Sequence, residues 1–95
     1  MSAALPTRPR LARRARVRWD EREGKHLLVY PERGLLLNAV AARIVALVDG
    51  TRTVPELVAA LLADFPDAPS ERVEGESRAF LQSLADRGLL AEGDP

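Results

Sequence analysis

With 95 residues, of which 46% are apolar and 29% charged, the chain has the composition of a folded protein and the length of a single domain, because two cores would each bury too little apolar surface. It has no cysteine, which excludes disulfides, a thiolate nucleophile, a zinc ribbon and a self-held iron–sulfur cluster. The formal net charge is zero, but residues 1–33 hold nine basic and four acidic residues, whereas residues 34–95 hold five and ten.

The apolar segments are too short for membrane insertion or export. The longest uninterrupted runs have a few residues, whereas a membrane-spanning helix needs about 20. The basic N-terminus is not followed by the hydrophobic segment of a signal peptide. We therefore expect a cytoplasmic protein with no membrane partner.

The N-terminal third predicts an arm and a hairpin. Residues 1–15 contain two prolines and four arginines without apolar periodicity, so we expect a flexible basic arm. Alternation of period two then begins, with Val17 and Trp19 on one face, and predicts a half-buried strand. A polar turn ending in Gly24 leads to a second, more apolar strand over 25–30.

A third strand and three helices complete the prediction. Pro31 and Gly34 interrupt the apolar run, so that residues 35–37 return as a short strand. Asn38 is suited to cap a first helix that ends at Asp49-Gly50, and 53–56 is a capping box for the second. The third helix opens at Pro69-Ser70 and stops at Gly88, after which Leu89-Leu90 add a last short strand.

This order predicts an α+β, winged-helix-like fold in which a three-stranded antiparallel sheet is followed by three helices. We expect residues 16–90 to form one peptide-binding domain. The flexible arm 1–15 precedes it, and a C-terminal tail, 91–95, follows.

The sequence offers little for catalysis. Its single histidine, His26, lies in a strand and has no nucleophile, glycine-rich loop or carboxylate pair near it in sequence. We therefore predict that the chain is not an enzyme and has no catalytic residues, no metal site and no cofactor.

The winged-helix outline raises DNA binding as a rival function. The arginines between Arg8 and Arg18 are able to neutralise phosphates. The third helix, however, carries more acids than bases, and such a helix would be repelled by a duplex. We therefore expect no nucleic-acid partner, and keep a DNA-binding regulator as the alternative.

The third strand is the more informative feature. It is short and apolar on both faces, so an edge position would leave its main-chain donors and acceptors available to an added strand. Strand addition takes affinity from main-chain hydrogen bonds and specificity from side-chain pockets. The third helix could supply such pockets, although its apolar stripe is more often the protein's own core. That stripe consists of Val73, Ser77, Phe80, Leu81 and Leu84.

The residues resemble the PqqD family over about residues 8–90. The most specific parts are Tyr30-Pro31-Glu32 before the third strand and 49–54, with the sequence DGTRTV, between the first two helices. Further matching positions are 16–20, 27–29, Arg33-Gly34, Leu37-Asn38, Ala41-Ala42, Ile44, Glu56-Leu57, Phe80-Leu81, Leu84 and 87–89.

The resemblance implies a RiPP recognition element, a winged-helix-like domain that binds peptide instead of DNA. A PqqD protein is a peptide chaperone that binds the ribosomal precursor peptide PqqA and presents it to the radical SAM enzyme PqqE in pyrroloquinoline quinone (PQQ) biosynthesis. The leader segment is expected to add as a strand beside the third strand and to rest on the third helix. A different modified peptide remains an alternative.

Carried over to this chain, the resemblance implies an edge at 33–37 and a wall on the third helix. Basic leader residues would pair with Glu76, and acidic ones with Arg33 or Arg72. The expected peptide-binding residues are Arg33, Gly34, Leu35, Leu36, Leu37, Arg72, Val73, Glu76, Ser77, Phe80, Leu81 and Leu84.

Overall fold

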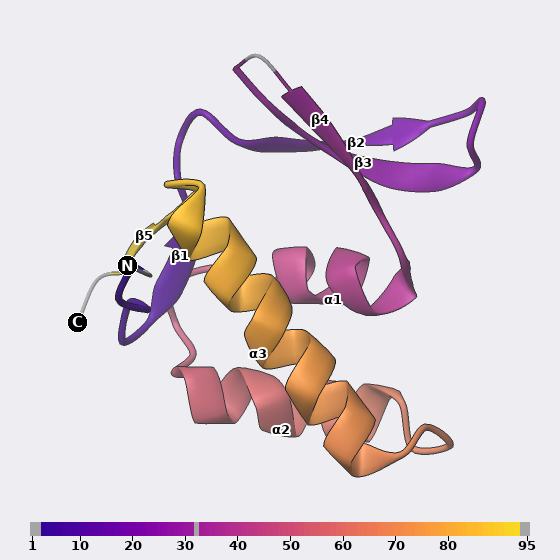
Figure 1. The fold of residues 1–95 in the computed structure, drawn as a ribbon, viewed down its shortest axis with the longest axis vertical. Helices are drawn as coiled ribbons and strands as arrows, with labels where there is room; N and C mark the ends of the chain where they lie inside the picture. The colour runs from indigo at the N-terminus through magenta and orange to yellow at the C-terminus, as the bar shows by residue number, and fades with distance from the viewer. Residues whose placement is uncertain (1–2, 32, 94–95) are drawn as a thin grey trace.

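A computed structural model of the chain describes residues 3–31 and 33–93, and it contains the predicted sheet and helices (Figure 1). The sheet comes first in the chain, and the helices follow. The strands are β2 (Arg16–Asp20), β3 (Lys25–Tyr30) and β4 (Arg33–Leu37), and the helices are α1 (Ala39–Leu47), α2 (Val54–Asp64) and α3 (Ser70–Asp86).

The sheet is antiparallel and has the strand order β2-β3-β4, so β4 is an edge strand as expected. Its inner face rests on α1 through Leu28 and Leu37, which are almost fully buried. The register places Val17 opposite Leu28, and Leu28 opposite Leu35, on this same face. Among the described residues, the helices all lie on the other side of the sheet (Figure 1), and the apolar residues of the outer face include Leu36, which is 44% exposed.

The first strand of the sheet was predicted to be half-buried, but it is more exposed than that. Val17 and Trp19 do share a face, but they are 43% and 53% exposed. The ring of Trp19 packs edge-on against His26, with 5.1 Å between the ring centroids. Their exposure follows from the position of β2 at the edge of the sheet opposite β4.

The helix boundaries follow the capping residues. The Asn38 side chain accepts a hydrogen bond from Ala41 N, and Thr53 and Glu56 form the predicted capping box. The third helix begins at Ser70, and Gly88 follows its end at a φ of +71°, a conformation that glycine adopts without strain. Local chemistry therefore sets where each helix begins and ends.

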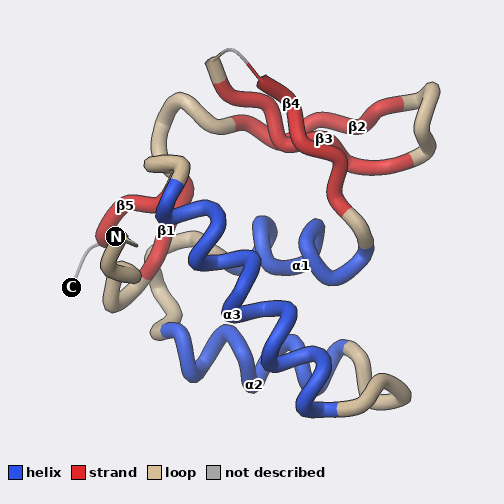
Figure 2. The backbone as a smooth tube through the Cα atoms, viewed as in Figure 1, coloured by secondary structure: helices blue, strands red, loops and turns tan. Residues whose placement is uncertain are grey.

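Two connected clusters of buried side chains form the core. One joins the three helices through residues such as Ile44, Leu57 and Leu81. The other lies between the sheet, α1 and the end of α3, and includes Leu28 and Leu84. Figure 2 shows α1 between the strands of the sheet and α2, so α1 contributes to both clusters.

The prediction of a flexible arm through residue 15 is wrong for the segment that precedes the sheet. Residues 9–11 form β1 (Pro9–Leu11), which pairs antiparallel with β5 (Leu90–Glu92) in a second, two-stranded sheet. Pro9 is fully buried. The predicted tail is likewise part of the fold up to Gly93, whose N–H donates to Arg8 O. Alternation over three residues is too short to predict a strand, and only the distant partner makes one here.

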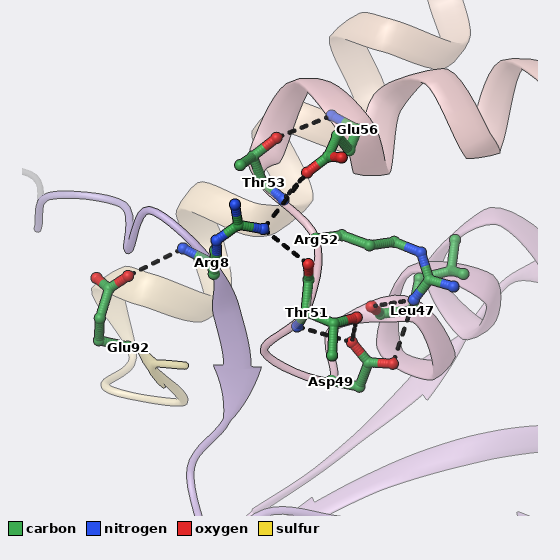
Figure 3. A network of polar contacts seen from close by, with 8 residues as sticks. All are labelled: Arg8, Leu47, Asp49, Thr51, Arg52, Thr53, Glu56 and Glu92. Carbon is green, nitrogen blue, oxygen red and sulfur yellow. Dashed lines mark hydrogen bonds and ion pairs between the residues drawn. The ribbon is translucent and has the colours of Figure 1, made fainter. Parts of the chain in front are cut away.

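The connection between α1 and α2 holds this second sheet in place (Figure 3). The guanidinium of Arg8 donates to Thr51 O at 2.8 Å and lies 3.6 Å from the carboxylate of Glu56. On the other side, the backbone N–H of Arg8 donates to the carboxylate of Glu92 at 2.9 Å. Three distant parts of the chain therefore meet at one arginine.

Candidate functional site

The open edge of β4 is the first component of the candidate site. Within the described residues β4 pairs only with β3, so its other side has no strand partner. Tyr30 and Arg33 close the β3–β4 hairpin, and the closing pair of a two-residue hairpin normally forms two main-chain hydrogen bonds between its residues. Further along an antiparallel pair of strands, residue pairs that bond in this way alternate with pairs whose N–H and C=O groups point away from the partner strand. By that alternation, Gly34 and Leu36 direct their N–H and C=O groups outward.

An apolar pocket lies where β4 runs into α1. It has a volume of about 320 Å³, and Glu76 is the only ionisable residue among those that line it. Because α1 supplies one wall and α3 the other, the pocket is a cleft between two helices at the end of the open strand. Its lining residues are Asn38, Val40, Ala41, Ile44, Glu76, Ala79 and Phe80.

A second pocket, of about 240 Å³, lies at the other end of β4 and is cationic. Arg33 begins the strand, and Arg87 follows the C-terminal end of α3. Tyr30 ends β3, Pro31 lies in the β3–β4 turn, and Arg14 comes from the connection between β1 and β2. The open strand is therefore flanked by an apolar pocket at one end and a basic one at the other.

The accessible face of α3 differs from the predicted wall. Val73, Ser77, Leu81 and Leu84 are at most 2% exposed, and the Ser77 hydroxyl donates to Val73 O at 2.5 Å. These four are core residues in this structure, and their contact with a peptide stays a prediction. An amphipathic helix turns its most apolar stripe to its own core, so a guest meets the adjacent one. The accessible stripe is Arg72, Glu76, Ala79, Phe80, Ser83 and Arg87.

The remaining predicted residues divide by exposure. Arg33, Gly34 and Leu36 are exposed, and Leu35 and Phe80 are partly so, whereas Leu37 is 2% exposed and supports the strand from below. The two predicted charge partners of a leader, Arg72 and Glu76, bind each other at 3.0 Å in an exposed pair. A charged side chain of a bound peptide would therefore have to compete with the Arg72–Glu76 ion pair.

Sequence reasoning missed most of the residues that line the two pockets. Asn38, Val40 and Ala79 line the apolar pocket, and Arg14 and Arg87 line the basic one. For Ala79 a signal was present, because it follows Glu76 by three positions and so lies on the same side of the helix. No sequence pattern joins Arg14 to Arg33, since folding alone brings these residues together.

The family model for coenzyme PQQ synthesis protein D (PqqD) matches residues 25–90, more than half of the chain. The chain belongs to the PqqD family. The matched segment runs from the start of β3 to the start of β5 and so includes the open strand and all three helices. The resemblance inferred from the sequence is confirmed.

Curated relatives in the PqqD family are similar along most of their length. The "PqqA binding protein" of Stutzerimonas stutzeri is 39% identical over 79 residues, which are 83% of this chain and 84% of that protein. That of Rhodopseudomonas palustris strain HaA2 is 34% identical over 92 residues, 97% of this chain and 89% of the relative. These names describe binding and not catalysis, in agreement with the prediction that the chain is not an enzyme.

Two solved structures show the fold. The PqqD part of Methylobacterium extorquens PqqCD, described as a functional, stand-alone RiPP recognition element, is 34% identical with a TM-score of 0.72, covering 95% of this chain and 97% of that one. TbiB1 in complex with the TbiA(beta) leader peptide has a TM-score of 0.68 at 23% identity, covering 90% and 99%, and supports the fold alone. The predicted α+β fold is confirmed as that of a recognition element.

Proposed function

We propose that this chain is the peptide chaperone of PQQ biosynthesis that binds a PqqA-like precursor peptide. Its PqqD-family membership and its relatives named as PqqA binding proteins support the assignment. The observation that carries the mechanism is the open edge of β4 beside an apolar pocket. A guest strand would complete the hydrogen bonds of that edge and place a side chain in the pocket.

Presentation of the bound peptide to a PqqE-like radical SAM enzyme is part of the proposal. Strand addition would hold the leader and leave the rest of the precursor available for modification. A cytoplasmic site of action also remains a prediction. In the structure, no helix among the described residues is long and apolar enough to span a membrane.

Replacement of Leu36 by proline tests strand addition. We expect this change to weaken binding of a synthetic PqqA peptide by roughly tenfold or more, because it removes an outward N–H from the open edge. The fold should persist, since proline is tolerated on an edge strand where its nitrogen faces away from the neighbouring strand. Isothermal titration calorimetry measures the affinity, and a thermal melt followed by circular dichroism checks the fold.

Leu36→Ala is the matched control. It removes the same exposed side chain but keeps the N–H, so its affinity should stay within about threefold of the unmodified protein. Equal affinities for a folded Leu36→Pro variant and the control would rule out strand addition at β4. Tight, steeply salt-dependent binding of duplex DNA would instead favour the regulator.

A further inference from the structure

The cationic pocket at the start of β4 is built by side chains from three separate parts of the chain. Arg33 lies opposite Tyr30 in the β3–β4 register, so both side chains project from the same face of the sheet. Arg87 donates from Nη1 to Tyr30 Oη at 2.7 Å and from Nε to Ser83 Oγ at 3.3 Å. The phenol thus holds the guanidinium of Arg87 at the pocket that Arg33 also lines.

Arg14 is fixed at the same place by backbone groups. Its Nη2 donates to Gly88 O at 3.0 Å and to Arg87 O at 3.4 Å, both just beyond the C-terminal end of α3. These bonds use one nitrogen of a guanidinium that has five N–H donors. The arginine is therefore held in place and keeps donors for another acceptor.

The charge in this pocket is not balanced by the acids that the structure places. Arg14, Arg33 and Arg87 form no ion pair with a carboxylate among residues 3–31 and 33–93, whereas the other exposed arginines of α3 pair with Glu74 and Glu76. Guanidinium groups bind carboxylates through two parallel hydrogen bonds. The pocket therefore has the chemistry to take a carboxylate from outside this chain.

The two pockets differ in charge and are separated by the length of the open strand. The apolar pocket carries Glu76 in its lining and would disfavour an acid, whereas the basic pocket would attract one. At about 3.4 Å per residue, the strand from Arg33 to Leu37 spans roughly 14 Å, the reach of about four to six extended guest residues. Charge and spacing together distinguish the two ends of a guest.

We propose that the Arg14–Arg33–Arg87 pocket binds an acidic side chain of the guest peptide and thereby sets its direction and register on β4. This inference rests on the proposed strand addition. All neighbouring strands of the sheet are antiparallel, and a guest that continues this pattern has its C-terminal end at Arg33. The guest then carries an apolar residue for the α1–α3 pocket, followed about four to six residues later by Asp or Glu.

Fluorescence anisotropy with a labelled synthetic PqqA peptide from the same organism tests this pocket. We expect Arg33→Gln and Arg87→Gln each to weaken binding by roughly three- to tenfold and to reduce its dependence on salt. Arg22→Gln, which removes an exposed arginine from the β2–β3 turn, is the matched control and should change affinity less than twofold. Thermal melts confirm that each variant is folded.

A scan of the peptide identifies the partner. Each acidic residue of PqqA is replaced in turn by its amide and titrated against the unmodified protein, Arg33→Gln and Arg87→Gln. We expect one acidic position, C-terminal to the residue that fills the apolar pocket, at which replacement by the amide weakens binding. For the peptide with that replacement, the arginine variants should bind no more weakly than the unmodified protein. The inference would be overturned if Arg33→Gln and Arg87→Gln lost no more affinity than Arg22→Gln. It would also be overturned if the effect of every peptide replacement were the same in the arginine variants as in the unmodified protein.

The same series separates this inference from the proposed function. If Leu36→Pro weakens binding and the arginine variants do not, strand addition stands, and binding of an acidic side chain in the Arg14–Arg33–Arg87 pocket is rejected. If PqqA does not bind the unmodified protein, or if binding is indifferent to all these changes, both proposals fail.

Discussion

At the scale of single residues, the family motif DGTRTV proves to be structural. The carboxylate of Asp49 accepts from Thr51 N at 3.0 Å, from Thr51 Oγ1 at 2.6 Å and from Arg52 Nη1 at 3.2 Å (Figure 3). The Thr51 hydrogen bonds, more than the charge of Arg52, hold the pKa of Asp49 below its ordinary value. Likewise, the backbone N–H of Thr53 lowers the pKa of Glu56. The motif therefore locks the α1–α2 connection and does not line either pocket at β4.

These shifted carboxylates predict how stability depends on pH. Because the folded-state pKa values of Asp49 and Glu56 lie below the ordinary values of 3.8 and 4.5, their stabilisation is complete above those values. It is lost as the pH falls through the folded-state pKa values. We expect the free energy of unfolding, measured with urea, to decrease below about pH 5.

Two variants check the origin of this decrease. Asp49→Asn and Thr51→Ala should each be less stable at pH 7 and should lose less stability between pH 5 and pH 3, because the first removes the titrating carboxylate and the second removes the hydrogen bond that Thr51 Oγ1 donates to it. If the free energy of unfolding of these variants fell with pH as steeply as that of the unmodified protein, other groups would be the cause of the acid sensitivity.

At the scale of elements, α3 performs two tasks on two adjacent stripes. One stripe, with Val73, Leu81 and Leu84, is buried against α1, α2 and the sheet. The other borders both pockets beside β4, through Ala79 near its middle and Arg87 at its end. The helix thus anchors the fold and forms the wall of the proposed groove.

Substitutions on the two stripes should separate stability from binding. Ala79→Arg places a long side chain in the apolar pocket, so we expect PqqA binding to fall at least tenfold with little change in the melting temperature. Leu81→Ala should instead lower the free energy of unfolding by about 2–5 kcal/mol, because it leaves a cavity in the core. Calorimetric titration and urea unfolding measure the two effects.

The control for the pocket is Ala59→Arg, at an exposed position of α2 outside the apolar pocket, which should retain full affinity. Undiminished binding by Ala79→Arg would place the peptide elsewhere.

At the scale of the whole molecule, the small β1–β5 sheet joins the two ends of the chain. Glu92 accepts from the backbone N–H groups of Thr7 and Arg8, at 3.0 and 2.9 Å. Gly93 crosses directly over Gly50, so that a Cβ on Gly93 would clash with the Gly50 backbone and lie 2.6 Å from Arg8 O. The helical core is thereby closed by a contact between chain segments far apart in sequence.

A pair of glycine substitutions tests that crossing. Gly93→Ala should destabilise the fold by about 1–3 kcal/mol, because backbone segments must move to admit the methyl group. Gly75→Ala, in the exposed middle of α3 with nothing within 4 Å of the added Cβ, should instead stabilise by about 0.5–1 kcal/mol. Urea unfolding at pH 7 gives both values, and equal effects of the two substitutions would contradict the close crossing.

The sequence by itself determined what depends on neighbouring residues. Asn38, Thr53 and Gly88 predict helix ends because capping is local chemistry, and the alternation before Tyr30 predicts a hairpin because side chains alternate along a strand. The edge position of β4 was implied by the resemblance to the PqqD family, and the strand order agrees with it.

Only the tertiary structure decided what depends on residues distant in the chain. It ordered Pro9–Leu11 by supplying β5, and it buried Leu81 and its neighbours on α3 in the core. It also brought Arg14, Arg33 and Arg87 together at one end of β4. Periodicity identifies the apolar side of a helix, but which surface remains open beside it is set by how the elements pack.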